Sequence, residues 1–162
     1  MALTLASYIK DGNTLDPEAF RARHPHHVLV VEPFAVEEEP ELSTSAGGDF
    51  AGGLPMVYPI ARQDSHALGD RVTIGRTGNN DIHINAPDVS KYHAYLVREG
   101  DTFSYVDADS KFGSWVNDAP VAAGERVRLS SGDRLRIASV KATIFDPEGF
   151  QVHVCRGRGQ RA

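Results

Sequence analysis

The sequence contains a single cysteine, Cys155, which excludes an internal disulfide and any zinc site built from several cysteines, and favours a reducing compartment. No apolar run approaches the roughly 18 residues that a membrane-spanning helix requires. The N-terminal segment MALTLASYIKDG lacks a basic region, and Lys10 and Asp11 interrupt its apolar stretch, so we expect no signal peptide. These absences are typical of a cytoplasmic protein without membrane insertion.

The composition is that of one ordinary globular domain with some additional chain. Of 162 residues, 41% are hydrophobic and 24% are charged, and 17 Lys and Arg against 22 Asp and Glu give a net charge of −5. A chain of this length can bury enough surface to fold without disulfides or metals, so stability gives no argument for a cofactor, and we expect none. The acidic balance argues against nucleic acid as a partner.

Positive charge is missing from a long stretch near the N-terminus. No Lys or Arg occurs in residues 24–61, where six Asp and Glu are found. Residues 37–53 combine acidic residues with Gly and Ser and have few large apolar side chains, so burial cannot offset the entropy of ordering them. We therefore expect a flexible acidic linker over 37–53.

The segment before this linker, residues 1–36, is expected to be an N-terminal extension made of a short helix and a strand. Asp16-Pro17-Glu18 supplies an N-cap, a proline at the first helical position and an acidic first turn, and the helix should end near His24-Pro25. Residues 28–31 are apolar and β-branched, which favours a strand. The extension could pack on the following domain or form a docking arm, including one for self-association, and the sequence leaves both open.

Residues 54–154 show short β-type runs separated by turn residues. Residues 126–129 and 134–137 alternate basic and apolar side chains, as strands do when one face is exposed to solvent and the other packs on the core. The pattern predicts an all-β sandwich of two twisted, mostly antiparallel sheets, with a disordered basic tail over 155–162. The expected strands cover residues 56–60, 71–75, 81–84, 93–97, 102–106, 114–116, 126–129, 133–137, 141–145 and 151–154.

Three of the connecting loops carry side chains suited to an anion. Arg76 follows a strand beside a Gly/Asn turn, and its guanidinium can contact phosphate through two hydrogen bonds. Ser90 and Lys91 place a hydroxyl next to an ammonium group, and Lys111 lies in a tight loop of small residues. Each loop alone is weak evidence because exposed charges are common.

In combination and order, these loops resemble the forkhead-associated (FHA) domain over roughly residues 56–154. The resemblance rests on five marks in register: Gly75-Arg76, Asn80-Asp81-Ile82, Ser90-x-x-His93, Gly113-Ser114-x-Val116-Asn117 and Gly132-Asp133-Arg134-Leu135-Arg136-Ile137. Five ordered marks are far more specific than one glycine motif. The resemblance implies a phosphothreonine-peptide-binding β-sandwich, here in a stand-alone, bacterial type of chain.

The resemblance also implies roles for individual residues and a class of partner. The partner would be a Thr-phosphorylated protein or a Ser/Thr kinase, and the chain would act as an adaptor in kinase signalling. Phosphopeptide contacts are implied for Arg76, Ser90, Lys91, Lys111, Phe112 and Ser114. Structural support of the site is implied for Gly75, His93, Gly113 and Asn117.

One position departs from the family pattern. FHA domains usually have Asn immediately before the second glycine, where its side chain bonds the peptide backbone, but this chain has Phe112. Loss of one or two such contacts costs about 1–3 kcal/mol, so weakened binding is expected. An exposed Phe is also a plausible apolar anchor, which leaves a phosphate-independent interaction scaffold as the alternative.

The sequence gives little support for catalysis or for metal binding. Ser90 and His93 are three residues apart, so on a strand they point to opposite faces, and no Gly-x-Ser-x-Gly motif is present. Residues 75–78 lack the third glycine and the helix of a dinucleotide site. His24, His26 and His27 have no acidic or cysteine ligand at suitable spacing. We therefore expect no catalytic residues and no metal site.

Overall fold

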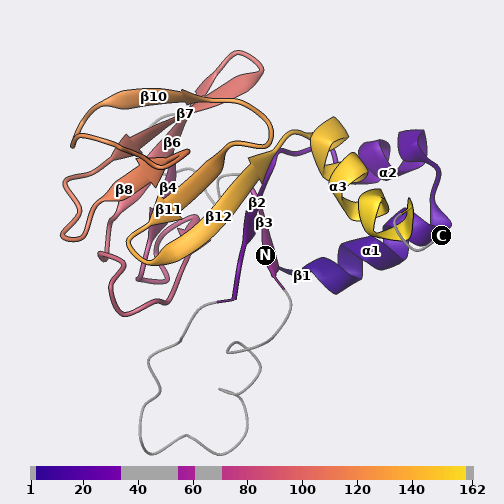
Figure 1. Ribbon diagram of the computed structural model, residues 1–162, viewed down its shortest axis with the longest axis horizontal. Helices are drawn as coiled ribbons and strands as arrows, with labels where there is room; N and C mark the ends of the chain where they lie inside the picture. The colour runs from indigo at the N-terminus through magenta and orange to yellow at the C-terminus, as the bar shows by residue number, and fades with distance from the viewer. Residues whose placement is uncertain (1–2, 34–54, 61–70, 160–162) are drawn as a thin grey trace, which may run out of the picture.

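The computed structural model of the chain describes residues 3–33, 55–60 and 71–159 (Figure 1). Within these ranges two sheets of mostly antiparallel strands share one apolar core, and helices gather at one side of the molecule. The predicted all-β sandwich is confirmed. The linker expected over residues 37–53 lies outside the described residues.

The larger sheet combines strands from both ends of the chain. β2, which comes from the expected N-terminal extension, pairs with β3 on one side and with β12 on the other. It is therefore an interior strand of the sandwich. In order across the sheet, the strands are β1 (Leu3–Thr4), β3 (Met56–Pro59), β2 (Val28–Val31), β12 (Val140–Phe145), β11 (Arg134–Ile137), β8 (Ser114–Val116) and β9 (Ala119–Pro120).

The smaller sheet carries the strands from which the loops singled out above emerge. β4 pairs antiparallel with β6 and parallel with the short β5, and β6 pairs antiparallel with β7. In order across the sheet, the strands are β10 (Arg126–Leu129), β7 (Thr102–Asp107), β6 (Ala94–Glu99), β4 (Arg71–Gly75) and β5 (Ile82–His83).

Strand β2 takes part in two separate apolar cores. Leu29 and Val31 belong to the cluster that joins the two sheets, whereas Val28 and Val30 belong to a second cluster shared with the helices. Successive side chains of a strand point to opposite faces, so a strand covered on both faces must be apolar throughout. This explains why all four residues of β2 are buried.

Three helices are found in the described ranges: α1 (Leu5–Thr14), α2 (Pro17–Arg23) and α3 (Pro147–Gly159). α2 begins as the sequence predicted, with the Asp16 carboxylate accepting a hydrogen bond of 2.7 Å from the Ala19 backbone N–H. α1 was not predicted. None of these helices, over the part of the chain that is described, is long and apolar enough to cross a bilayer.

Helix α3 corrects two expectations for the C-terminal end. Residues 151–154 were expected to form a strand and residues 155–162 a disordered tail, but α3 extends to Gly159. The Asp146 carboxylate accepts a hydrogen bond of 2.6 Å from the Gly149 N–H and so caps the helix. Phe150 and Val154, one helical turn apart, are both buried, whereas the intervening Val152 is exposed. The burial pattern is helical.

The helices cover part of the outer face of the larger sheet. Tyr8 of α1 and Phe20 of α2 contact Phe150 of α3, with ring centroids 5.1 and 5.9 Å apart. The same cluster includes Val30 of β2 and Val57 of β3. Tyr8, Phe20 and the apolar residues of β2 are thus buried within this chain, which favours packing of the N-terminal segment on the domain over a free docking arm.

Truncating the centre of this helical layer should destabilise the protein. Phe150 is fully buried, so Phe150→Ala is expected to lower the free energy of unfolding by about 3–5 kcal/mol through lost burial and a residual cavity. Val152 is 51% exposed on the same helix, and Val152→Ala should change the free energy by no more than about 0.5 kcal/mol. Denaturant unfolding followed by circular dichroism measures both. Equal effects of the two substitutions would contradict the packing described.

Candidate functional site

Three loops at the end of the sandwich away from the helices are joined by hydrogen bonds (Figure 1). The first follows β4, the second precedes β6, and the third connects β7 with β8. The Arg76 N–H in the first loop donates to the Ser90 carbonyl in the second at 3.0 Å. The Lys111 N–H in the third loop donates to the Ser90 hydroxyl oxygen at 3.1 Å. The structure therefore brings together residues that the sequence placed up to 35 positions apart (111 − 76).

The Arg76 side chain is held by the neighbouring second loop, while part of its guanidinium stays available. Its Nε–H donates to the Val89 carbonyl at 3.0 Å, which fixes the side chain beside the second loop. Among the described residues, its two terminal nitrogens have no hydrogen-bond partner. A fixed guanidinium with unused N–H groups is a donor suited to a phosphate or carboxylate.

The Ser90 hydroxyl is arranged to donate. Because its oxygen accepts from the Lys111 N–H, its proton can be directed to a ligand. Lys91 and Lys111 flank it, and both side chains are exposed. The site thus gathers a guanidinium, a hydroxyl and two ammonium groups in a chain whose net charge is −5.

His93 supports this arrangement from beneath. Its ring is fully buried; Nδ1 accepts from the Ser90 N–H at 3.1 Å, and Nε2 donates to the Gly113 carbonyl at 3.0 Å. These two bonds require the neutral ring with its proton on Nε2. Burial lowers the pKa of His93, although the Gly113 carbonyl and the carboxylate of Asp107 partly oppose the shift. The imidazole joins the second loop to the third.

Asp107 organises the third loop and was not identified from the sequence. Its carboxylate accepts from the Ser110 N–H at 2.8 Å and from the Ser110 and Ser114 hydroxyls at 2.6 Å each. Burial opposes its ionisation, but the hydrogen bonds from Ser110 and Ser114 outweigh burial and lower the pKa of Asp107. The Asp107-x-x-Ser110 spacing, typical of a side-chain-stabilised turn, was the available signal.

The structure gives Ser114 a different role from the peptide contact that was expected. The residue is buried, and its hydroxyl donates to Asp107 while it contacts the Tyr105 hydroxyl at 2.7 Å. Because the Ser114 proton goes to Asp107, the Tyr105 hydroxyl is the donor in that second bond. Burial raises the pKa of Tyr105, which keeps the phenol protonated. Ser114 therefore supports the third loop from inside and does not face a peptide.

Two glycines and a second unpredicted residue shape the loops. A Cβ on Gly75 would lie 2.1 Å from the Lys91 carbonyl oxygen, so only glycine permits this approach. Asn80 fixes the same carbonyl by donating to it from Nδ2 at 2.7 Å. Gly113 has a φ of +84°, in the left-handed region that favours glycine. Asn80 was part of a sequence mark, but its role became visible only in the structure.

Asn117 supports a different part of the molecule than expected. Its side chain accepts from the Arg134 N–H at 2.9 Å and donates to the Asp133 carboxylate at 3.1 Å. It follows β8 at Val116, at the opposite end of that strand from Gly113. Asn117 thus ties the β8–β9 turn to the start of β11, and among the described residues its side-chain hydrogen bonds go to Asp133 and Arg134 and not to the three loops.

Phe112 extends from the third loop into solvent, with 52% of its surface exposed. The Lys111 ammonium nitrogen lies 5.4 Å from the centre of its ring. Tyr92, 38% exposed, lines a pocket between the first two loops together with Thr77 and Lys91. The cationic donors are thus flanked by exposed aromatic rings, and the Phe112 ring has no group that can bond a peptide backbone. Over the described residues, no three His, Cys, Asp or Glu side chains are grouped as metal ligands.

Comparison with known proteins identifies a family. The FHA domain model matches residues 72–138. The oxoglutarate dehydrogenase inhibitor of Corynebacterium diphtheriae is 30% identical over 118 residues, covering 65% of this chain and 80% of that protein. Protein FraH of Nostoc sp. is 34% identical over 61 residues, and the match spans 38% of this chain but only 21% of FraH.

Solved structures show the same fold at lower sequence identity. The N-terminal FHA domain of Rad53p from S. cerevisiae, in complex with a phosphothreonine peptide, has a TM-score of 0.52 and 16% identity, covering 78% of this chain and 97% of that one. The FHA domain of a Chlamydia trachomatis protein has a TM-score of 0.52 and 15% identity, covering 75% and 97%.

The buried imidazole should make stability depend on pH. The lowered pKa of His93 means that, between this value and the unfolded value of about 6.5, the unfolded chain binds more protons than the folded one. The free energy of unfolding should therefore fall as the pH drops below about 6.5, by at most about 1.4 kcal/mol per pH unit for this group. His27, whose pKa is also lowered by burial, adds an effect of the same sign.

Nitrogen NMR of the His93 ring separates its contribution from that of His27. At a pH of about 6.5, the spectrum should show the neutral ring with the proton on Nε2, and urea unfolding over the same pH series should show the loss of stability. A doubly protonated His93 ring in the folded protein at this pH would contradict the assignment.

Proposed function

Because this chain belongs to the FHA-domain family, we propose that it is a phosphothreonine-peptide-binding module that acts as an adaptor in Ser/Thr kinase signalling. The observation that supports this most is the convergence of Arg76, Ser90 and Lys111 from three loops, where the terminal nitrogens of Arg76 have no hydrogen-bond partner among the described residues. Lys91 adds a third cationic group, which is exposed. A dianionic phosphate is the ligand that satisfies such a donor set best.

A binding role is also in keeping with what the site contains. Its buried histidine, His93, uses both ring nitrogens to hold loops, so this ring has no nitrogen left to act as a base. Ser90 and His93 are joined through the Ser90 backbone N–H, and not through its hydroxyl, which leaves that hydroxyl without a base. We therefore propose that the chain is not an enzyme.

The expected affinity is modest. Three charge-assisted hydrogen bonds contribute about 1.5–3 kcal/mol each, and ordering an extended peptide consumes part of the total. Without the usual Asn at position 112, about 1–3 kcal/mol of backbone contact is missing. We expect dissociation constants between about 10 μM and 1 mM for phosphothreonine peptides.

A phosphate-independent interaction scaffold is the second candidate, and the exposure of Phe112 is the observation that favours it. An apolar ring that is 52% exposed beside a recognition loop could anchor a partner directly. The retention of Arg76, Ser90, Lys91 and Lys111 at one place argues against it, because an apolar anchor needs none of them.

Phosphate dependence tests the proposed function. Fluorescence anisotropy with degenerate phosphothreonine, phosphoserine and unphosphorylated peptide pools should show binding only to phosphorylated pools. Arg76→Ala should weaken it by at least about tenfold, because charge-assisted bonds to phosphate are lost. Arg98→Ala, which removes an exposed arginine on β6, is the matched control and should have little effect. Equal binding of phosphorylated and unphosphorylated pools would favour the scaffold.

Substitution of Phe112 also distinguishes the phosphopeptide-binding module from the phosphate-independent scaffold. Phe112→Asn restores the amide that FHA domains usually have at this position, and we expect it to tighten phosphothreonine-peptide binding by about 5- to 150-fold. The same anisotropy titration measures the change, with Phe112→Ala as control for loss of the ring. Weaker binding of both variants would mean that the Phe112 ring itself is the anchor.

A further inference from the structure

The outer face of the larger sheet is covered by helices only in part. The helical cluster lies against β2 and β3, whereas the exposed side chains of β11 and β12 remain uncovered by the helices. On β11, Arg134 and Arg136 are exposed and alternate with the buried Leu135 and Ile137. This open face lies outside the three loops of the candidate phosphopeptide site.

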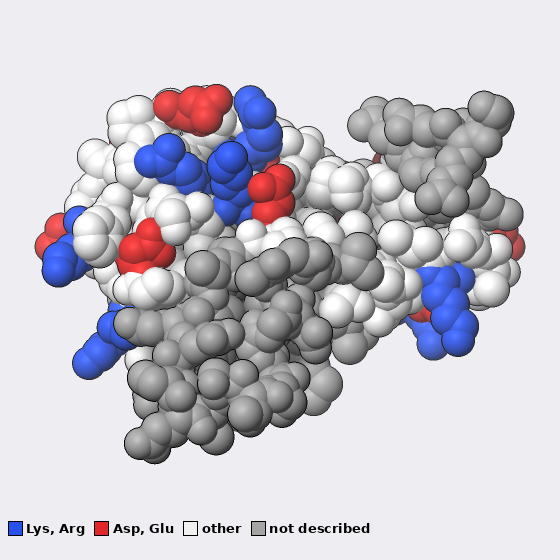
Figure 2. Space-filling model, turned by 60° about the horizontal axis from the view of Figure 1, so that its bottom comes forward, with Lys and Arg blue, Asp and Glu red and all other residues white. Residues whose placement is uncertain are grey.

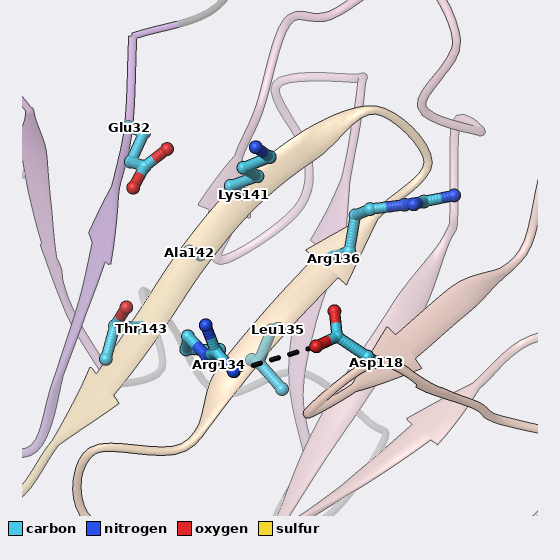
Figure 3. A pocket seen from close by; sticks show the side chains of 8 residues that line it. All are labelled: Glu32, Asp118, Arg134, Leu135, Arg136, Lys141, Ala142 and Thr143. Carbon is cyan, nitrogen blue, oxygen red and sulfur yellow. Dashed lines mark ion pairs between the residues drawn. The ribbon is translucent and has the colours of Figure 1, made fainter.

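A hollow on this face is lined by three basic side chains from neighbouring strands. Arg136 of β11 lies opposite Lys141 of β12 in the strand register, and Arg134 lies opposite Thr143. Glu32 and Asp118 stand at the margins of the hollow (Figure 3). Figure 2 shows a group of Lys and Arg side chains on the strand-bearing part of the surface, with acidic side chains beside it.

Two of these cations are available for an acidic partner. Arg134 pairs with the Asp118 carboxylate at 3.6 Å, but both side chains are largely exposed, so this pair contributes little. For Arg136 and Lys141, no carboxylate lies within 4.0 Å among the residues that the structure describes. Arg136 is fixed in place, because its guanidinium stacks 3.8 Å from the Trp115 ring centre and its Nε–H donates to the Ala138 carbonyl at 3.1 Å.

A second hollow continues the first toward α3 and is more apolar. The two hollows share Arg134 and Thr143. The second is lined further by Phe145, which stacks on His153 at 4.6 Å, and by Val152, whose side chain is exposed at 51%. The open sheet face thus carries two adjoining hollows, together called the groove, with a cationic end at Arg136 and Lys141 and an apolar end at α3.

We propose that this groove docks an acidic peptide segment of a partner protein, one that carries an apolar side chain a few residues from its carboxylates. The carboxylates would contact Arg136 and Lys141, and the apolar side chain would pack against Val152 and Phe145. Glu32 and Asp118 at the margins disfavour a uniform polyanion such as nucleic acid, which would meet repulsion there. The docking needs no phosphate and is independent of the loops around Arg76.

The proposal is tested with short, unphosphorylated, fluorescein-labelled peptide pools and the full chain. One pool combines Asp and Glu with Leu, Val and Phe; the second replaces the acids by Asn and Gln; the third replaces the apolar residues by Ser. The first pool should bind at least about tenfold more tightly than either of the others. No binding of the first pool at millimolar protein, or equal binding of all three, overturns the proposal.

Charge reversals locate the binding. Arg136→Glu with Lys141→Glu should weaken binding of the first pool by at least about tenfold. Arg98→Glu with Arg128→Glu makes the same change in net charge at exposed positions of the smaller sheet and should leave the affinity within about threefold. Circular dichroism checks that both double variants are folded. Equal weakening by the two pairs overturns the proposal, because it means that net charge alone matters.

Two further measurements keep this groove distinct from the proposed phosphopeptide site. Proton–nitrogen correlation NMR should place the largest amide shifts caused by the first pool on β11, β12 and α3. Arg76→Ala should leave binding of the first pool unchanged, even if it abolishes phosphopeptide binding. Shifts centred on the loops around Arg76 and Lys111, or loss of binding in Arg76→Ala, overturn the proposal.

Discussion

The neutral imidazole of His93 is the point at which the loops of the site are held in register. Each ring nitrogen has one partner, the Ser90 N–H on one side and the Gly113 carbonyl on the other, and the ring itself is fully buried. In a low-dielectric interior an unpaired nitrogen would be costly, so the two loops have little freedom to separate. The Ser90 hydroxyl and the Lys111 N–H owe their alignment to this link, and the Val89 carbonyl, next to Ser90 in the chain, holds the Arg76 guanidinium beside them.

The strands of the sandwich could be predicted because alternation is a local signal, but the helices depend on packing that one sequence does not display. α2 was found from its Asp-Pro-Glu start, while the same three residue types at Asp146-Pro147-Glu148 fell between two expected strands, 141–145 and 151–154. The β-branched Val152 and Val154 favoured a strand there, and burial of Phe150 and Val154 on one side made it a helix. α1 contains Gly12 and Asn13, weak helix formers, and is stabilised by packing onto α3.

The candidate site was predictable where its residues form ordered marks along the chain. Arg76 and Ser90 belong to such marks and Lys111 lies just before another, at Gly113, and the structure joins their loops. Ser114 was misplaced because a hydroxyl next to a recognition loop gives no sign of its burial. Asp107 was missed because its function lies in hydrogen bonds from Ser110 and Ser114, which depend on how the third loop folds back on it. Residue type identifies donors, whereas their direction depends on the fold.

The central proposal for this site is that the loops bearing Arg76, Ser90 and Lys111 hold a phosphate group. Proton–nitrogen correlation NMR of the full chain, titrated with a phosphothreonine peptide and with its unphosphorylated form, tests this most directly. The account predicts that the amides of these three residues show the largest shifts and that the unphosphorylated peptide leaves them unmoved. Identical shifts with both peptides, or phosphate-dependent shifts confined to other parts of the chain, would contradict it.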